Sequence, residues 1–216
     1  MTDARKQLAL PGLAFELVPR RGEPRRVKAP RKFGGLPDGL FFALNLDSAA
    51  ACEARQHALR LQAKYGLKSW PRPRSLLHVS LCSLGEYNGL PQSLVERAMA
   101  AAASVAMPPF EVAFDRVMSF KTYLVLTGEE GVGGVRRLEQ ALGKALEAGR
   151  VREPNRHFMP HITLIYDRTV VPPQRLRRAV RWRVEEFVLI HSLVGQTRHI
   201  VLKTFPLSGN PRDLTQ

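Results

Sequence analysis

Two short apolar stretches of the chain are interrupted by the same polar pattern. The first reads LLHVSL within residues 75–83, and the second reads MPHITL within residues 159–167. In a β-strand, side chains alternate between two faces, so a histidine and the hydroxyl residue two positions later share one face. The pattern therefore predicts two strands that are apolar on one face and polar on the other. The polar pairs are His78 with Ser80 and His161 with Thr163.

The other elements follow from hydrophobic periodicity and from the residues that begin and end helices. Asp47 precedes a helix-like segment that runs to Tyr65, and Gly66 follows it, which is typical of a capped helix. Apolar runs and period-two alternation predict strands at 39–46, 110–118, 121–127, 183–193 and 199–207. Helical periodicity predicts helices at 48–65, 91–105, 135–148 and 173–180.

The predicted elements repeat around the two polar pairs. Each histidine strand has a helix before it and a helix after it, and the second histidine lies 83 positions after the first. This order indicates an internal duplication within a single domain at 38–207. We expect an α+β fold in which two antiparallel-rich sheets face each other across a central groove, related by a pseudo-two-fold axis and covered by outer helices.

The net positive charge of the chain favours an anionic ligand. The chain has 33 Lys and Arg against 19 Asp and Glu, a formal net charge of +14 and a pI of about 10.7. Such a surface attracts polyanions, and arginine forks suit phosphate groups. Residues 1–37 carry nine basic residues against three acids and five prolines, so we expect a disordered basic tail. Residues 208–216 are expected to be loose.

Composition also bears on the setting of the protein. No apolar run reaches the length of a membrane span, and residues 1–10 lack the apolar core of a signal peptide. The two cysteines, Cys52 and Cys82, have no CxxC spacing, which favours a reducing compartment. We therefore expect a cytoplasmic protein that does not bind a membrane.

The two histidines suit phosphodiester cleavage. In this reaction one group takes a proton from the attacking oxygen, and another gives a proton to the leaving oxygen on the opposite side of phosphorus. Imidazole serves both roles because its ordinary pKa is about 6.5. The hydroxyls of Ser80 and Thr163 are placed to hydrogen-bond the other phosphate oxygens. A duplicated motif therefore matches the symmetry of an in-line displacement.

The sequence gives less support to a metal site, a cysteine nucleophile or a dinucleotide-binding loop. Each H-x-[ST] motif offers one metal ligand, and no Cys, His or Asp cluster supplements it, so we expect no metal and no cofactor. Cys82 shares the strand parity of His78, which would place it toward the groove, and the alternative is a small buried hydrophobic residue. No partner that would deprotonate it is evident. The run GEEGVGG at 128–134 lacks the spacing of a dinucleotide fingerprint and is interpreted as a loop.

Aromatic residues near the motifs are candidates for stacking on a nucleobase. Phe42 and Tyr123 lie on predicted strands beside the two motifs, and burial in the core is the alternative for both. Trp70, between basic residues in the loop 68–74, is a more exposed candidate.

The paired motifs resemble those of the 2H phosphoesterase superfamily, and within it the LigT-like 2′-5′ RNA ligases, also called RNA 2′,3′-cyclic phosphodiesterases. The matching segments are HVSL at 78–81, LG at 84–85, PHITL at 160–164, LFFAL at 40–44 and RHIVL at 198–202. The resemblance covers residues 40–207. It implies a bilobal α+β fold and a two-histidine mechanism without metal.

The resemblance also implies roles for single residues. His78 corresponds to the general acid and His161 to the general base, while Ser80 and Thr163 correspond to the residues that hold the phosphate. Arg198 and His199 stand where relatives often carry an arginine beside an aromatic residue, so both are candidates to line the groove, and ordinary strand packing is the alternative. Relatives often have an aromatic residue in place of Ser83 and an arginine in place of Tyr166, for which Arg168 is the nearest substitute.

The expected activity is hydrolysis of a ribose 2′,3′-cyclic phosphate, on an RNA end or a nucleotide, to a 2′-phosphate. We expect a monomer with RNA or such a nucleotide as its partner and no protein partner. Two alternatives stay open. The chain binds RNA without turnover, or it acts as a 2′-5′ RNA ligase in the reverse direction, which the same residues would catalyse.

Overall fold

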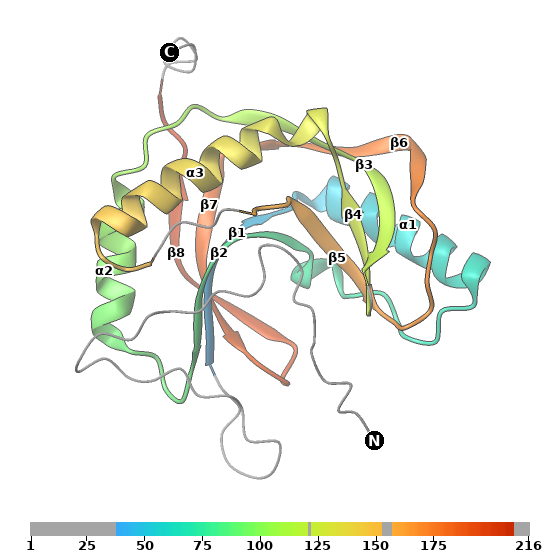
Figure 1. The fold of residues 1–216 in the computed structure, drawn as a ribbon, viewed down its shortest axis with the longest axis horizontal. Coiled ribbons are helices and arrows are strands. Elements are labelled where there is room, and N and C mark those ends of the chain that lie inside the picture. The colour runs from blue at the N-terminus through green and yellow to red at the C-terminus, as the bar shows by residue number, and fades with distance from the viewer. Residues whose placement is uncertain (1–37, 121, 153–156, 210–216) are drawn as a thin grey trace.

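The computed structural model describes residues 38–120, 122–152 and 157–209 (Figure 1). The predicted tail at 1–37 lies outside the described residues, as does most of the end at 208–216. Within the described part, no helix has the length and apolarity needed to cross a membrane.

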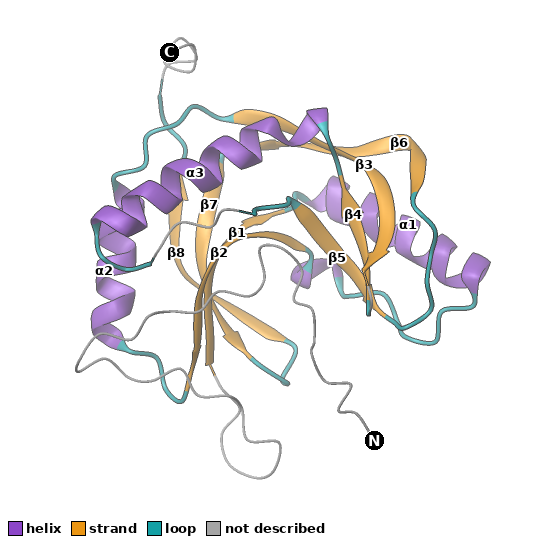
Figure 2. Cartoon of the chain, in the orientation of Figure 1, coloured by secondary structure: helices purple, strands orange, loops and turns teal. Residues whose placement is uncertain are grey.

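In the described residues, eight strands and three α-helices make up an α+β fold, with the helices on the outside of the strands (Figure 2). The strands are β1 (Asp38–Asn45), β2 (His78–Tyr87), β3 (Phe110–Phe120), β4 (Tyr123–Thr127), β5 (His161–Tyr166), β6 (Gln174–Val184), β7 (Glu186–Leu193) and β8 (Arg198–Pro206). The helices are α1 (Ser48–Tyr65), α2 (Gln92–Ala103) and α3 (Gly133–Ala148), with short 3-10 turns at Arg74–Leu76 and Glu130–Val132.

Helix α1 begins and ends where the sequence predicts. The carboxylate of Asp47 accepts a hydrogen bond from the backbone N–H of Ala50 at 2.7 Å, which satisfies one of the free donors of the first turn. Gly66 ends the helix in the left-handed region, with φ of 63°, where a residue without a Cβ is favoured. The buried side of α1 is mostly alanine, so the helix packs closely on the strands.

All strand pairings are antiparallel, in the order β6-β3-β4-β5-β2-β1-β7-β8. Strands β2, β1, β7 and β8 form the first half of the molecule, and β5, β4, β3 and β6 form the second half. In the described residues the halves are paired through one pair, Val79 of β2 opposite Ile162 of β5. We call this pair the seam.

The strand pairings confirm the internal duplication. Both halves contain the same irregularity, in which one residue of the histidine strand has no partner. The flanking pairs are Phe42–Cys82 and Ala43–Ser80 in the first half and Leu124–Ile165 and Val125–Thr163 in the second half. The unpaired residues at these equivalent positions are Leu81 and Leu164, and β2 has a further irregularity at Leu84. Each bulge reverses which face the later residues of its strand occupy.

Helices α1 and α3 hold the halves together. Helix α1 follows β1 of the first half but packs against β5 and β6 of the second, and α3 contacts β2 as well as β3. The buried side of α3 carries Leu138, Leu142 and Leu146, all fully buried, as its periodicity predicts. Gly134, in the first turn of α3, lies against the ring of Phe110, so that a Cβ at this position would overlap the ring.

The prediction of a helix at 173–180 is wrong, because this segment is part of strand β6. Along β6, Val180, Trp182 and Val184 are buried while Arg181 and Arg183 between them are exposed. Pairing with β3, which runs from Gln174 to Val184, decides the structure of the whole segment. β6 is an edge strand, and its exposed arginines discourage pairing with another chain.

Two boundaries also differ from prediction. β2 continues to Tyr87, beyond the stretch 75–83 in which the sequence predicts this strand. The strand predicted at 183–193 is divided between the end of β6 and β7.

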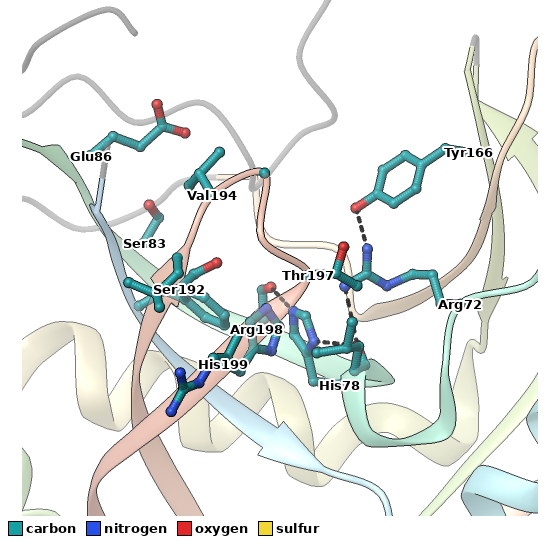
Figure 3. A pocket seen from close by; sticks show the side chains of 15 residues that line it. Arg72, His78, Ser83, Glu86, Tyr166, Ser192, Val194, Thr197, Arg198 and His199 are labelled. Carbon is teal, nitrogen blue, oxygen red and sulfur yellow. Dashed lines mark hydrogen bonds between the residues drawn. The ribbon is translucent and has the colours of Figure 1, made fainter. Parts of the chain in front are cut away.

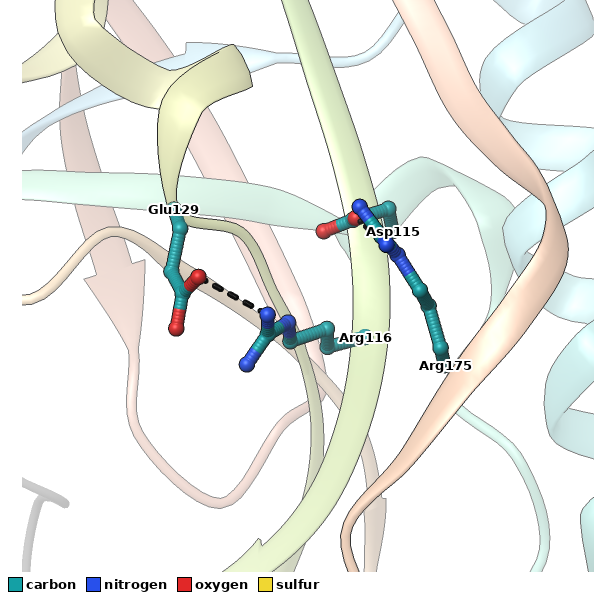
Figure 4. A network of polar contacts seen from close by, with 4 residues as sticks. All are labelled: Asp115, Arg116, Glu129 and Arg175. Carbon is teal, nitrogen blue, oxygen red and sulfur yellow. Dashed lines mark hydrogen bonds and ion pairs between the residues drawn. The ribbon is translucent and has the colours of Figure 1, made fainter.

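Surface ion pairs join β6 and the loop before α3 to β3. Arg175 lies 3.0 Å from Asp115, and Arg116 lies 2.8 Å from Glu129 (Figure 4). Because most of these side chains are solvent-exposed, each pair contributes less than about 1 kcal/mol to stability. The buried apolar core, rather than these pairs, fixes the sheet that carries the polar motifs.

Candidate active site

The two polar pairs lie on either side of the seam. Val79 and Ile162 point into the core and are fully buried, so their neighbours on both strands point to the opposite face. In antiparallel strands the neighbours of a pair lie crosswise. His78 therefore lies toward Thr163, and Ser80 lies toward His161. Folding brings residues 83 positions apart to a single place, as the duplicated motif predicts.

Both imidazoles are held in the same way. Nδ1 of His78 lies 2.9 Å from the carbonyl oxygen of Leu76, and Nδ1 of His161 lies 2.8 Å from that of Met159. A carbonyl oxygen only accepts, so each Nδ1 carries a proton and donates it. In the neutral ring Nε2 is then the free acceptor, and that of His78 lies 3.1 Å from the hydroxyl oxygen of Ser80 (Figure 3).

The surroundings of both rings favour the neutral form. Burial and the positive charges of Arg72, and of His199 and His161 when these are protonated, together lower the pKa of His78 to about 3, although the hydrogen bond to the carbonyl of Leu76 acts to raise it. Burial also lowers the pKa of His161, whose side chain is 5% exposed. Both histidines are therefore neutral at pH 7 in the empty site.

His78 and Ser80 open into a cavity of about 390 Å³, which we call the first cavity. Its other walls are β1, the loop between β7 and β8, and the start of β8. Arg198 and His199 line it, as expected, and the ring of His199 packs edge-on to that of His78 at 5.1 Å. His161 and Thr163 lie across the seam, outside this lining.

The aromatic residue that β1 contributes to the first cavity is Phe41, and the prediction that Phe42 binds substrate is wrong. Phe42 is fully buried and packs against Phe187 and Phe205 in the core. Phe41 lines the cavity, with its ring 5.1 Å from that of His78. The two neighbours point to opposite faces of β1, and a run of apolar residues does not show which face is buried.

Arg72 is a site residue that sequence reasoning missed. Its guanidinium lines the first cavity, donates a hydrogen bond to the hydroxyl of Tyr166 at 3.0 Å, and lies over the ring of Tyr166 at 5.2 Å (Figure 3). Its backbone N–H donates to the carbonyl oxygen of Leu164, which anchors this loop on β5. The buried Nε has no hydrogen-bond partner among the described residues. A fixed positive charge therefore lies beside His78 and His199.

The sequence of this chain also matches a known protein family. A model of the 2′-5′ RNA ligase superfamily matches residues 47–196, more than half of the chain. The chain belongs to this superfamily, the 2H phosphoesterases. This superfamily is a family of enzymes that includes phosphoesterases and 2′-5′ RNA ligases.

Solved structures of the superfamily share the fold. LigT of E. coli, crystallised with 3′-AMP, is 26% identical, with a TM-score of 0.64 over 80% of this chain and 99% of its own. TT0787 of Thermus thermophilus is 24% identical, with a TM-score of 0.65 and the same coverage of both chains. No curated protein matches the chain.

The matched bulges explain which residues of this superfamily member face the groove. Beyond the bulge, Cys82 points into the core, fully buried and with its sulfur 4.0 Å from the carboxylate of Glu139. The strand parity expected from His78 therefore fails at Cys82, and Ser83 lines the cavity instead. Burial raises the pKa of the Cys82 thiol to about 12, so it is not a nucleophile.

Tyr166 stands where relatives often carry an arginine, and in this structure another arginine lies beside it. Arg168, suggested by sequence as a replacement cation, lies outside the first cavity, whereas Arg72 lies directly against Tyr166. Tyr123 does not line the first cavity and faces a neighbouring one. Among the described residues, no group of three or more His, Cys, Asp or Glu side chains is placed to bind a metal ion.

Proposed function

We propose that the protein hydrolyses a ribose 2′,3′-cyclic phosphate, at an RNA end or on a nucleotide, to a 2′-phosphate. The observation that carries this proposal is the pair of imidazoles beside the seam, each fixed through Nδ1 and each with a hydroxyl residue two positions later. This arrangement supplies one proton acceptor and one proton donor on opposite sides of a phosphate without further groups.

His161 is proposed as the general base and His78 as the general acid. Neutral His161 accepts a proton from water at Nε2 as the water oxygen attacks phosphorus. The bond between phosphorus and the ribose 3′ oxygen breaks, and that oxygen takes a proton from Nε2 of His78. Because His78 is neutral in the empty site, it gains its proton when the anionic substrate binds and raises its pKa.

Three side chains are proposed to hold the phosphate. Ser80 and Thr163 occupy equivalent positions in the two halves and offer one hydroxyl each. Arg72 offers a guanidinium whose Nη1 and Nη2 are already oriented by Tyr166 and by the carbonyl oxygen of Leu76. Donors placed before the reaction stabilise the charge that develops on phosphate oxygens at little reorganisation cost.

The nucleoside is proposed to occupy the first cavity. Phe41 and His199 present aromatic rings there, and Arg198 adds a cation at the rim. Support comes from E. coli LigT, a relative of the same fold that was crystallised with 3′-AMP, a nucleoside with a phosphate on its ribose.

The test is turnover of adenosine 2′,3′-cyclic phosphate in the presence of EDTA. We expect adenosine 2′-phosphate as the product, and a loss of at least about 100-fold in kcat for His78→Ala and for His161→Ala. His57→Ala, on α1 and outside the cavity lining, serves as the matched histidine control and should retain activity. Full activity of either groove variant, or no product from the wild type, would refute the proposal.

A further inference from the structure

The end of the first cavity that lies far from His78 contains a single acidic side chain. Glu86 lines this end, and Figure 3 shows it on the opposite side of the lining from Arg72. Among the described lining residues it is the one Asp or Glu, in a cavity that also contains the cations of Arg72 and Arg198. The carboxylate of Glu86 forms no ion pair with any other described residue. It is therefore available to a ligand.

The strand register explains why Glu86 faces the cavity. The irregularity of β2 at Leu84, directly after Ser83, reverses the strand parity a second time. Phe41 of β1 pairs with Ser83, and Gly39, two positions earlier, pairs with Glu86. Because Phe41 lines the cavity, the pair Gly39–Glu86 lies on the same face of the sheet. The sheet itself thus directs the side chain of Glu86 into the cavity.

A row of residues crosses the sheet at the level of Glu86. Gly39 pairs with Glu86 on one side and with Ser192 of β7 on the other, and Ser192 pairs with His199 of β8. Because Gly39 has no side chain, the space between the carboxylate of Glu86 and the hydroxyl of Ser192 stays open. A Cβ at Gly39 would lie 3.4 Å from the Cβ of Ser192 and would enter this space. The row therefore presents an acceptor, a gap and a hydroxyl on one face.

The distance from the proposed phosphate site to Glu86 suits a nucleoside. Ser80, which is proposed to hold the phosphate, pairs with Ala43 of β1. Glu86 pairs with Gly39, four residues earlier on that strand. Four residues of a strand span about 13 Å. Phe41 lies between the two ends and lines the cavity, so a base that stacks on its ring brings its outer edge to Glu86.

From this arrangement we propose that Glu86 makes the first cavity a subsite for guanine. Guanine has two adjacent N–H donors on its Watson–Crick edge, N1 and the N2 amino group, and the two oxygens of a carboxylate accept both. Ser192 offers its hydroxyl to the guanine O6. Adenine and cytosine present one amino donor beside a ring nitrogen that accepts, and uracil presents a single N–H, so each matches less well. The inference rests on the proposed function, because it concerns the base of the same nucleotide.

The experiment removes the N2 amino group from the substrate and the carboxylate from the cavity. Turnover of guanosine 2′,3′-cyclic phosphate is compared with that of inosine 2′,3′-cyclic phosphate, which lacks only this amino group, in the wild type and in Glu86→Ala. In the wild type we expect kcat/KM to be at least about tenfold higher for guanosine, because inosine loses a hydrogen bond to a charged group. In Glu86→Ala the two values should agree within about twofold.

Glu96→Ala is the matched control, because Glu96 is exposed on α2 and does not line the cavity. Its ratio of the two kcat/KM values should equal that of the wild type. Equal kcat/KM for both nucleotides in the wild type, or an unchanged ratio in Glu86→Ala, overturns the guanine subsite while cyclic phosphate hydrolysis stands.

A wild type without turnover of either nucleotide overturns the proposed function instead. Calorimetric binding of guanosine 2′-phosphate and inosine 2′-phosphate then tests the base subsite separately. Tighter binding of the guanosine compound in the wild type, lost in Glu86→Ala, supports the guanine subsite. Equal affinities in the wild type overturn it.

Discussion

The protonation state of His78 is set by its neighbours. Burial and the charges of His199, Arg72 and His161 lower its pKa in the empty groove, whereas a bound phosphate adds a negative charge that raises it. The general acid therefore holds its proton to a higher pH in the enzyme–substrate complex than in the free enzyme.

This difference predicts two separated pH profiles for the cyclic phosphate. The profile of kcat/KM reports the free enzyme and that of kcat reports the complex. We expect the fall of kcat/KM with rising pH to occur at lower pH than the fall of kcat. The measurement is a steady-state pH series with adenosine 2′,3′-cyclic phosphate. Coincident falls in the two profiles would show that binding does not charge His78.

Arg72 offers a test of the phosphate-binding cation. Removing its positive charge should raise the pKa of His78, because that charge lowers it. We expect Arg72→Gln to reduce kcat/KM about 100-fold, the usual order for loss of one charge-stabilising donor. The His78 titration is followed by NMR in the same variant, which separates loss of charge from loss of fold.

Tyr166→Phe is the matched control for Arg72, because it removes the phenol contact and keeps the ring under the guanidinium. Because Tyr166 is 49% exposed, water can replace its hydroxyl as the partner of the guanidinium, so the net loss should be about 1 kcal/mol and the reduction in kcat/KM should stay within about fivefold. An equal loss in both variants would assign the effect to positioning of Tyr166 rather than to charge.

At the scale of elements, helix α3 contains two glycines in contrasting surroundings. A Cβ at Gly134 would overlap the ring of Phe110, whereas a Cβ at Gly143 would meet no atom within 4 Å. We expect Gly134→Ala to lower the free energy of unfolding by about 1–3 kcal/mol through overpacking. Gly143→Ala should raise it by up to about 1 kcal/mol, because alanine favours the helix. Urea denaturation of both variants measures the difference, and the same sign in both would contradict the packing described.

Elements with local end signals are predictable from the sequence, and those defined by tertiary pairing are not. Helix α1 is bounded by Asp47 and Gly66, which act through bonds within a few residues. The periodicity of segment 173–180 predicts a helix, but pairing with β3 makes it part of β6. A long-range partner decides this segment, and single-sequence periodicity does not contain that partner.

The candidate site likewise contains residues whose positions the sequence predicts and residues whose positions depend on tertiary contacts. His78, Ser80, His161 and Thr163 precede the bulges, so strand parity places them correctly on one face of the sheet. Cys82 lies beyond a bulge, and parity fails there. Arg72 comes from a loop whose position depends on its backbone bond to β5, and no spacing rule points to it.

At the scale of the whole molecule, the net charge of +14 is the dominant electrostatic feature. Longer RNA substrates bring more phosphates to this surface than a mononucleotide does. We expect kcat/KM for an oligonucleotide with a terminal cyclic phosphate to fall more steeply with salt than that for the mononucleotide. Each additional phosphate contact should cost about fivefold over a tenfold rise in salt concentration. Steady-state kinetics in a NaCl series measure both slopes, and equal slopes would show that only the terminal nucleotide is bound.

The seam has a mechanical consequence. Val79 and Ile162 form a fulcrum between the two halves, and the paired histidines flank it directly. Rocking of one half against the other would swing the distant rims of the groove widely while shifting groups at the fulcrum very little. Helix α1, which reaches from the first half onto β5 and β6, braces the joint and limits that swing. The groove would thus bind ligands of different size while the distance between the imidazoles of His78 and His161 stays nearly constant.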